Sequence, residues 1–385
     1  MSEKKNVPKL RFPEFTEPWE QRKLGDCVEF LDTMRKPLKE GDREKGQYPY
    51  YGASGIVDYV SDYIFDEELV LLSEDGANIT DRNYPVCFLA SGKCWVNNHA
   101  HVLKTNKENE NNFICNSLER MDFTPYNSGM AMPKLNKEVC QKIPLSCPSF
   151  AEQKEIGDYF RSLDRLITLH QRKLDHVKDL KKSMLQKMFP KNGQLYPEVR
   201  FPEFTDAWEQ RKLGEIATFI NGRAYSQSEL LSSGKYKVLR VGNFYTNDSW
   251  YYSDLELGDK YYADYGDLLY TWSATFGPHI WLGDKVIYHY HIWKIDLSNQ
   301  LEKQFAVQLL EQDKANILSS KNGSTMVHIT KERMEQKDVI IPPSIKEQQK
   351  IGAFFIRLDN LITLHQRELD HIKLLKKGML QQMFV

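Results

Sequence analysis

The sequence has no long apolar run, no closely spaced cysteine pair and little net charge. No apolar stretch approaches the roughly 20 residues that cross a bilayer, so we expect no membrane segment. None of the six cysteines forms a C-x-x-C pair, which disfavours a zinc ribbon or a redox dithiol and favours reduced, mostly buried thiols. The polar start Met-Ser-Glu-Lys-Lys-Asn lacks the apolar core of a secretory signal, so we expect a cytoplasmic protein.

Catalytic motifs are also missing. There is no G-x-G-x-x-G or Walker A loop, and no Asn-Pro-Pro-aromatic motif of an adenine methyltransferase. Glu152 and Lys154 have the E-x-K spacing of some nuclease sites, but they lie at an expected helix start, where capping is favoured. His289 and His291 alternate on an expected strand, where a DNA-facing or core-edge role is favoured over a metal. We therefore expect no catalytic residue, no metal site and no cofactor bound by this chain.

The net charge of −1 gives no general support for a nucleic-acid partner. The charge is unevenly distributed, however. Residues 149–190 carry nine Lys and Arg against six Asp and Glu, and residues 344–385 carry seven against four. Any surface that binds nucleic acid must therefore be a local patch.

The sequence does contain a long internal repeat. The heptapeptide Leu166–Arg172 recurs unchanged at Leu361–Arg367. A leader at Arg11–Gly25 recurs at Arg200–Gly214, with thirteen of fifteen positions identical. The offset is 189 residues for the leaders and 195 for the heptapeptides, so the second intervening segment is six residues longer. A repeat of this size indicates a duplicated architecture.

Each heptapeptide lies in a segment whose apolar residues recur at alternating steps of four and three, the spacing of a coiled-coil seam. The predicted pairing positions are Ile156, Phe160, Leu163, Ile167, His170 and Leu174, and then Ile351, Phe355, Leu358, Ile362, His365 and Leu369. Two readings of the seam histidines stay open: they fix the helix register, or they are satisfied at the seam edge. We expect Lys181 and Lys376, further along the seam, to extend their ammonium groups into solvent.

Two globular segments lie between the repeated elements. Their short apolar and aromatic runs, broken by Gly, Asn and Asp, indicate strands joined by turns. We expect strands at 48–52, 56–60, 69–72 and 86–89 and a helix at 111–123, and then strands at 238–241, 267–272 and 286–293 and a helix at 304–318. Because these elements fall in matching order, the two segments are expected to share one fold and to differ in surface.

The predicted organisation follows the repeat. It comprises a leader at 1–18, a globular domain at 19–148, a long helix at 149–189, a linker with the second leader at 190–207, a second globular domain at 208–343 and a second long helix at 344–385. Ser149 and Ser344 are predicted to cap the helices, with Glu152 and Glu347 completing capping boxes.

Connectivity favours antiparallel pairing of the two helices. Each would be about 57 Å long at 1.5 Å per residue. The second globular domain joins the end of the first helix to the start of the second, so a parallel pair would require it to span that length. We therefore predict an α+β protein with two related domains separated by an antiparallel two-helix coiled coil, with pseudo-two-fold symmetry.

These features resemble the specificity (S) subunit of type I restriction–modification systems, over nearly the whole chain. The resemblance rests on the leader ending Trp-Glu-Gln-Arg-Lys-Leu-Gly and on the helix starts at Pro148–Gly157 and Pro343–Gly352, which share Pro-x(3)-Glu-Gln-x(2)-Ile-Gly. Residues Tyr50–Tyr59 and Leu239–Asn243 also look like segments of that family's target-recognition domains.

The resemblance implies a non-catalytic DNA-recognition subunit. Each target-recognition domain would read one half of an asymmetric, bipartite site in double-stranded DNA, while the helices set the spacer. The helices would also dock two modification (methyltransferase) subunits that carry S-adenosylmethionine, and restriction subunits with ATP and Mg²⁺ would join the complex. The alternative is a coiled-coil scaffold that binds protein partners without DNA readout.

DNA contacts are expected from Arg, Lys, Asn and Gln at base edges and from Lys, Ser and Tyr at the backbone. The candidates in the first domain are Arg35, Lys36, Lys39, Tyr51, Ser54, Asn78, Arg82 and Lys134. Those in the second domain are Arg223, Tyr225, Arg240, Asn243, Tyr245, Lys321 and His328. Taken singly, each of these residues is more often a solvated surface residue than a DNA contact.

Overall fold

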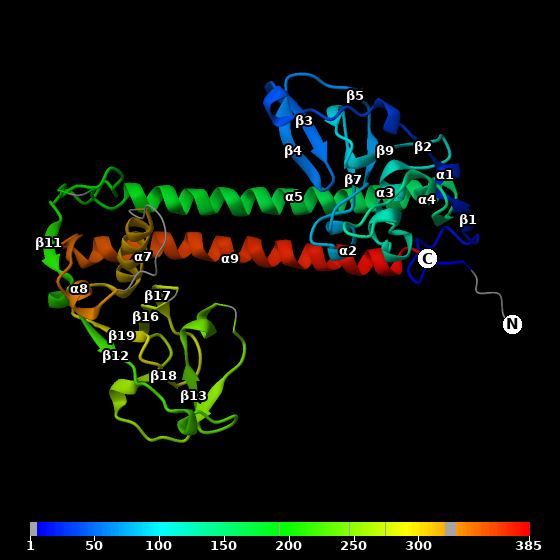
Figure 1. Ribbon diagram of the computed structural model, residues 1–385. Helices are drawn as coiled ribbons and strands as arrows, with labels where there is room; N and C mark the ends of the chain where they lie inside the picture. The colour runs from blue at the N-terminus through cyan, green and yellow to red at the C-terminus, as the bar shows by residue number, and fades with distance from the viewer. Residues whose placement is uncertain (1–5, 192, 246, 274, 320–328) are drawn as a thin grey trace. The chain divides into compact units, whose positions relative to one another are not determined.

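The computed structural model describes residues 6–191, 193–245, 247–273, 275–319 and 329–385 (Figure 1). The chain divides into two compact units: unit 1 comprises Met1–Arg172 and Gln366–Val385, and unit 2 comprises Lys173–His365. The division falls within both long helices, so each unit holds one globular segment and part of each helix. Within the described ranges, no helix has the length and apolar character needed to span a membrane.

The described residues of unit 1 form two four-stranded sheets and one strand pair. The first sheet has the order β2 (Val28–Phe30), β9 (Ala100–Thr105), β6 (Leu69–Ser73) and β7 (Cys87–Ala90). The second has the order β4 (Gly55–Val60), β3 (Lys45–Gly52), β8 (Lys93–Val96) and β5 (Phe65–Asp66). The pair joins β1 (Glu20–Lys23) to β10 (Pro144–Cys147) and thereby brings the two ends of the globular segment together.

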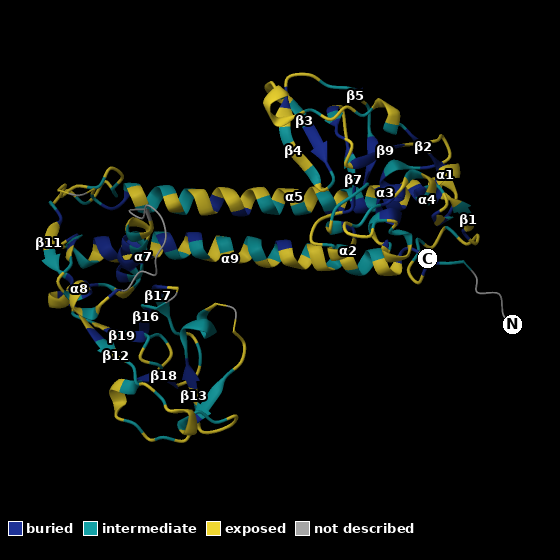
Figure 2. Cartoon of the chain, viewed as in Figure 1, coloured by how far each residue is buried: buried dark blue, intermediate teal, exposed yellow. Residues whose placement is uncertain are grey.

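Strand β6 lies at the centre of unit 1 and is buried along its whole length. Successive side chains of a strand point to opposite faces. Val70 and Leu72 accordingly join the core that contains helix α3 (Asn111–Glu119), whereas Leu69 and Leu71 join the core that contains residues of the second sheet. Figure 2 shows the same concentration of buried residues on the strands of this unit. The first sheet is therefore the middle layer.

The remaining short helices of unit 1 are α1 (Leu24–Cys27), α2 (Asn78–Asp81), α4 (Lys137–Cys140) and the 3₁₀ turns η1 (Asp32–Met34), η2 (Glu40–Asp42) and η3 (Thr124–Tyr126). All six cysteines of the chain are free and buried in this unit.

Unit 2 repeats this topology sheet by sheet. Its sheets have the orders β12-β19-β16-β17 and β14-β13-β18-β15, and β11 pairs with β20. The strands are β11 (Glu209–Lys212), β12 (Ala217–Asn221), β13 (Tyr236–Leu239), β14 (Tyr251–Ser253), β15 (Tyr262–Ala263), β16 (Leu268–Thr271), β17 (Gly277–Ile280), β18 (Val286–Tyr288), β19 (Ile292–Leu297) and β20 (Asp338–Ile341). The helices are α6 (Leu213–Ile216), α7 (Lys303–Ser319) and α8 (Lys331–Glu335), with turns η4 (Gln227–Glu229), η5 (Val241–Phe244) and η6 (Asp259–Tyr261). The prediction that the two segments share a fold is confirmed.

One predicted strand of unit 2 is wrong. Residues 286–293 form two strands, β18 and β19, which belong to different sheets. The chain turns between them, where the N–H of Ile292 donates to the carbonyl of His289 (3.0 Å). His289 and His291 therefore lie in a turn and do not share the face of a strand.

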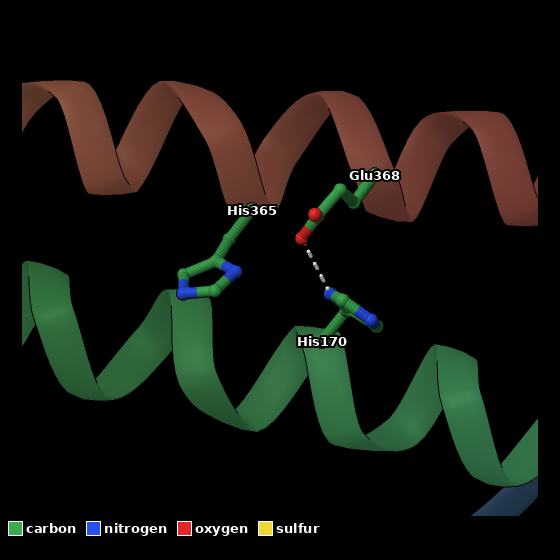
Figure 3. A group of neighbouring side chains, drawn as sticks. All are labelled: His170, His365 and Glu368. Atoms are coloured by element: carbon green, nitrogen blue, oxygen red, sulfur yellow. Dashed lines mark ion pairs between the residues drawn. The ribbon is translucent and has the colours of Figure 1, made fainter.

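The long helices are α5 (Phe150–Lys187) and α9 (Ile345–Gln382). Within unit 1 they run antiparallel. Asp164 of α5 pairs with Lys376 of α9 (2.6 Å), and further along α5 His170 pairs with Glu368 (3.0 Å), which comes earlier in α9. Figure 3 shows the second pair. Within unit 2, Lys181 of α5 pairs with Asp359 of α9. The predicted antiparallel pairing is confirmed. The expectation that Lys181 and Lys376 extend into solvent is wrong, because each ammonium binds an aspartate of the other helix.

Most of the predicted pairing positions are buried. The buried ones are Ile156, Phe160, Leu163, Leu174, Ile351, Phe355, Leu358 and Leu369, and the half-buried ones are Ile167, His170, Ile362 and His365. Of the two readings for the seam histidines, the structure places His170 Nδ1 at the edge of the seam, 3.0 Å from a carboxylate oxygen of Glu368 on the other helix. A role in register stays a prediction.

The repeated leader binds the start of the helix that follows it. Arg11 donates from Nε and Nη2 to the two carboxylate oxygens of Glu152 (2.6 and 2.7 Å), and Trp19 Nε1 donates to the same group (3.2 Å). Glu152 is only 1% exposed, so its charge requires such a partner. The predicted capping-box role of this carboxylate is wrong, although Ser149 Oγ does accept the N–H of Glu152 (3.4 Å).

Unit 2 has the same clamp, in which Arg200 and Trp208 bind Glu347 at 2.7, 2.9 and 3.2 Å. The capping-box role predicted for Glu347 is wrong for the same reason. The Arg and Trp of the repeated leader are therefore explained by a buried carboxylate at the helix start.

Each long helix ends by inserting a phenylalanine into a globular core. Phe384, just after α9, stacks on Phe113 of unit 1 (5.4 Å, 27°) and lies near Trp19 and Phe160. In unit 2, Phe189, just after α5, stacks on Phe305 (5.4 Å, 23°), beside Trp208 and Phe355. The end of α9 thus completes unit 1, and the end of α5 completes unit 2.

Candidate nucleic-acid interface

Three strand ends of unit 2 lie side by side and carry cationic or aromatic residues. Arg223 follows β12, Arg240 follows β13 and His289 follows β18. The backbone of Arg223 forms a bridge to His289, whose N–H donates to the carbonyl of Leu239 (2.9 Å). Side chains from three different strands are thereby gathered at one edge of the unit.

Aromatic rings hold the two arginines of this edge. The Arg223 guanidinium lies 5.2 Å from the ring centroid of Tyr225, and the Arg240 guanidinium lies 4.2 Å from that of Tyr251. Tyr225 also stacks on His289 (6.4 Å, 27°). A cation over an aromatic face is attracted by the ring quadrupole, so each guanidinium is held close to its ring.

Several donors of this edge have no partner inside the protein. Arg223 Nη1, Tyr225 Oη and Arg240 Nε are buried, and none hydrogen-bonds to any residue in the described ranges. Buried polar groups, charged ones above all, are normally hydrogen-bonded. These donors therefore mark a place where an external acceptor would be favourable.

The turn between β18 and β19 adds a wall of rings, in which Tyr290 and Trp272 join the two histidines that the sequence had singled out. Tyr290 lies 3.9 Å from His291 and 4.4 Å from His289, and Trp272 lies 5.0 Å from His291, all between centroids. Burial, and then the charges of His291 and Arg240, lower the pKa of His289 to about 4. His289 is therefore neutral at neutral pH and does not repel the arginines. Only the correct placement of the turn would have revealed this wall.

Asn243 and Tyr245, two further candidates of unit 2, have partners within the unit. Asn243 Oδ1 accepts the backbone N–H of Arg240 (3.0 Å), and its Nδ2 donates to the carbonyls of Asn247 and Ser249. Tyr245 is 41% exposed, and its hydroxyl lies 3.1 Å from His279 Nε2. Lys321 and His328 lie outside the described residues.

Arg35 of unit 1 is part of a buried ionic cluster. Its Nη1 binds Glu74 (2.6 Å) and the carbonyl of Ala100 (2.8 Å), and its side chain is 12% exposed. Lys134 also approaches Glu74, at 3.4 Å. The structure therefore brings two predicted contact residues together through one carboxylate. Because Arg35 and Lys134 both contact Glu74, the loop after β2 and the residues before α4 are connected to the end of β6.

Other candidates of unit 1 are engaged in local packing. Asn78 bonds to the backbone of Tyr84 in both directions, and Arg82 bonds to the Glu119 carboxylate (3.2 Å). Tyr51 is buried, and burial, followed by Cys94 and Tyr59, raises its pKa to about 12. The exposed candidates are Lys36, Lys39 and Ser54. No contact with DNA is tested for any of these residues, so those roles stay predictions.

Each unit also contains a basic cleft beside its long helices. The cleft of unit 1 has a volume of about 1110 Å³. Its charged lining consists of Arg82, Arg120, Arg161, Arg165, Arg172, Lys373, Lys376 and Lys377, with the acids Glu119 and Asp164. The cleft of unit 2, about 1150 Å³, is lined by Lys178, Lys181, Lys182, Lys191, Lys314 and Lys337, with the acids Glu311 and Asp313. Both clefts are strongly cationic.

The two clefts are related by the repeat. Lys373, Lys376 and Lys377 of the first cleft occupy the same helix positions as Lys178, Lys181 and Lys182 of the second, 195 residues apart. The middle lysine of each triplet pairs with an aspartate. The outer lysines have no acidic group within ion-pair distance in the parts of the chain that the structure describes. Their charge is therefore available to a partner.

The architecture is that of a duplicated α+β domain with cationic and aromatic loops and two long antiparallel helices. A family profile described as the type I restriction modification DNA specificity domain matches residues 16–179 and again residues 205–374. The chain belongs to this family. The expected family, fold class and DNA-recognition function are thus confirmed, and the scaffold alternative is not favoured.

Relatives agree over nearly the whole length. A protein of Haemophilus influenzae named as a type I restriction enzyme specificity subunit is 26% identical over 350 residues, covering 89% of this chain and 88% of the relative. The type I restriction enzyme MjaVIII specificity subunit of Methanocaldococcus jannaschii is 22% identical over 405 residues, covering 97% and 93%.

Two solved structures show the same fold. The S subunit of a type I restriction–modification system from M. genitalium has a TM-score of 0.69 at 14% identity, covering 98% of this chain and 99% of that one. A chain from a study of type I complex assembly and conformational transition has a TM-score of 0.54 at 15% identity, covering 96% and 99%.

Proposed function

We propose that this chain recognises an asymmetric, bipartite site in double-stranded DNA, with each globular domain reading one half. The duplication carries the proposal, because both units have the same sheet topology but different residues at equivalent loops. The turn between β8 and β9 reads Asn97-Asn98-His99, whereas the equivalent turn of unit 2 reads His289-Tyr290-His291. Different donors and acceptors favour different bases, so the half-sites should differ.

The chain is proposed to act without catalysis of its own. Methyl transfer would be performed by two modification subunits that bind S-adenosylmethionine, and cleavage by restriction subunits that use ATP and Mg²⁺. The complex would act in the cytoplasm. The absence of methyltransferase and nucleotide-binding motifs from the sequence supports this division of labour.

The helices are proposed to set the spacer between the half-sites. Support comes from their continuity, since α5 and α9 each have 38 residues and each contributes to both units. A continuous helix transmits a fixed rise of 1.5 Å per residue. The separation of two readers joined by such helices would be fixed by helix length.

The two basic clefts are proposed to dock the two modification subunits. Each cleft combines its two outer helix lysines, which have no acidic partner among the described residues, with apolar side chains at repeat-related positions. These are Leu380 and Ile167 in one cleft and Leu185 and Ile362 in the other. An amphipathic, acidic segment of a protein partner would bury the apolar residues and neutralise the lysines. Two equivalent clefts favour two copies of one partner.

Sequencing of methylated bases in cells that express the complex tests the recognition proposal. We expect a single non-palindromic motif with an unspecified spacer. Replacing residues 19–148 with those of a relative should change one half of the motif and leave the other intact. Methylation without sequence preference, or a change in both halves, contradicts the proposal.

Charge reversal in each cleft tests the docking proposal. Lys373→Glu with Lys377→Glu should reduce the complex from two modification subunits to one, as should Lys178→Glu with Lys182→Glu, and all four together should abolish binding. Mass measurement of the purified complex gives the stoichiometry. The matched control is Lys107→Glu with Lys142→Glu, two exposed lysines outside the clefts. Two bound subunits in the quadruple variant would refute docking at the clefts.

A further inference from the structure

The backbone of Arg240 is fixed at the edge where the strand ends of unit 2 meet. Leu239, the preceding residue, is fully buried and accepts the N–H of His289. On the other side, the N–H of Arg240 donates to Asn243 Oδ1, and the amide of Asn243 is in turn anchored by two backbone carbonyls. Asn243 is therefore a positioning residue for Arg240.

The side chain of Arg240 is oriented but electrostatically uncompensated. Its guanidinium lies 4.2 Å from the ring centroid of Tyr251, and the cation–π attraction holds it at that ring. Its Nε is buried without a hydrogen-bond partner, and no carboxylate lies within ion-pair distance, among the residues that the structure describes. Arg223, by contrast, binds Glu229 at 2.6 Å. Of the two arginines at this edge, Arg240 is the one whose charge the unit leaves for a ligand.

A guanidinium held in one place suits a base edge. Arginine presents a rigid fork of N–H groups, and this fork matches the O6 and N7 acceptors of guanine in the major groove. The same fork can bind a phosphate, but a phosphate contact gives no base discrimination, so a base-by-base binding test distinguishes the two contacts. The aromatic stack and the Asn243 anchor restrict direction, and direction matters for reading a base.

We infer that Arg240 is a specificity-determining residue, with which unit 2 reads a guanine of its half-site while Tyr251 holds the guanidinium in place. The inference rests on the proposed function, because it assumes that unit 2 reads one half-site. The ring of His289 beside Arg240 is neutral at neutral pH and adds no positive charge of its own.

The test measures binding of the complete methyltransferase complex to duplexes in which each base pair of the two half-sites is replaced in turn, at one fixed salt concentration. In the wild type, replacing one G·C pair of the second half-site should weaken binding roughly tenfold to a hundredfold. In Arg240→Ala and Arg240→Lys that penalty should disappear, because neither side chain can form the bidentate contact. The penalties at the first half-site should stay unchanged, which shows that the variants are folded and assembled.

Tyr251 provides a second, conservative pair of variants. Tyr251→Phe keeps the ring and should keep the penalty at the same base pair, whereas Tyr251→Leu should reduce it. A second half-site without a G·C pair overturns the inference. The inference is also overturned if the Arg240→Ala complex retains every penalty. It is overturned too if the Arg240→Lys complex retains full discrimination, because a residue that contacts only a phosphate does not determine base preference. A wild-type complex without any base preference would instead refute the proposed function.

Discussion

At the scale of single residues, a buried histidine helps to hold together the loops of unit 1 that carry its candidate DNA contacts. His101 is 1% exposed, its Nδ1 lies 2.7 Å from Asp32 Oδ2, and its Nε2 lies 2.7 Å from the carbonyl of Leu135. Burial lowers the pKa of His101, but the hydrogen bonds and charges of Asp32 and Cys140 outweigh it and raise the pKa to about 10. The protonated imidazole thus joins the loop after β2 to the loop before α4.

This pair makes the stability of unit 1 dependent on pH. Because the pKa of His101 in the folded protein lies above its unfolded value of 6.5, its contribution is complete below about pH 6.5 and is lost as the pH rises through about 10. Between pH 7 and pH 10, we expect the free energy required to open β9 to fall by roughly a few kcal/mol. In His101→Gln this loss should be absent, since glutamine does not titrate.

Hydrogen exchange of residues 100–105, corrected for the intrinsic rate at each pH, measures the effect. Residues 292–297 of β19 are the internal control, because the residue equivalent to His101 there is Trp293. An equal loss of protection in β9 and β19 would rule out the titration of His101 as the cause.

The sequence predicts which types of residue lie near the candidate interface, but it does not predict which partners their side chains contact. Arg35 and Arg82 look like surface cations when the sequence is read locally. Their partners, Glu74 and Glu119, lie 39 and 37 residues further along the chain. Ion pairs between distant segments form only after the strands have paired, so a local pattern carries no signal for them. Arg240 has no such partner among the described residues, so its interpretation as a surface cation from the local sequence still holds.

At the scale of the element, the last residues of α9 are part of the core of unit 1. Phe384 is 5% exposed and packs against Trp19, Phe113 and Phe160. Phe384→Ala should destabilise unit 1 by about 3–5 kcal/mol, because it removes a large buried side chain and leaves a cavity. Hydrogen exchange of α3 should accelerate accordingly, while exchange of α7 in unit 2 should stay unchanged.

A matched control lies on the same helix. Leu374 is 69% exposed, so Leu374→Ala should change stability by less than about 0.5 kcal/mol. Phe189→Ala should give the opposite pattern: hydrogen exchange of α7 should become faster, and exchange of α3 should stay unchanged. If Phe384→Ala accelerates both helices alike, the assignment of the end of α9 to the core of unit 1 alone is incorrect.

The long helices were predictable because a seam repeated over many turns is a strong signal. The break between β18 and β19 was not, because Tyr288-His289-Tyr290-His291 continues an alternating aromatic pattern without Gly or Pro. The turn depends on His289 bonding to Leu239, a residue of another strand. The role of Glu152 was misread for a similar reason, since Arg11 is 141 residues away from it.

At the scale of the whole molecule, the duplication is the feature that the sequence reveals most directly. The nearly identical leaders and the identical heptapeptides mark the parts that both units share, namely the clamp on the helix start and the paired helices. The segments that differ between the copies carry the candidate DNA contacts. Selection for two different half-sites would preserve the shared parts and diversify the rest. The repeat in this chain shows that distribution of shared and differing segments.

Helix length offers a test of the molecule as a ruler. Seven residues inserted in α5 after Asp175, together with seven in α9 after Leu364, would keep the heptad register of both helices and would leave the lining of both clefts undivided. Both points belong to unit 2, where the antiparallel helices are paired by Lys181 and Asp359. The insertion adds about 10.5 Å of helix, which corresponds to at most about three base pairs at 3.4 Å each. We therefore expect a longer spacer between two unchanged half-sites.

Sequencing of methylated bases would report the half-sites and the spacer in one experiment. Insertion into α5 alone is the control, because it shifts the helix register without lengthening the pair and should impair assembly instead of producing a new spacer. An unchanged spacer in an active complex with both insertions would mean that helix length does not set the separation. Altered half-sites would mean that the helices contribute to base recognition. An unaltered pair of half-sites with a longer spacer would instead separate the two roles, with recognition in the globular domains and distance in the helices.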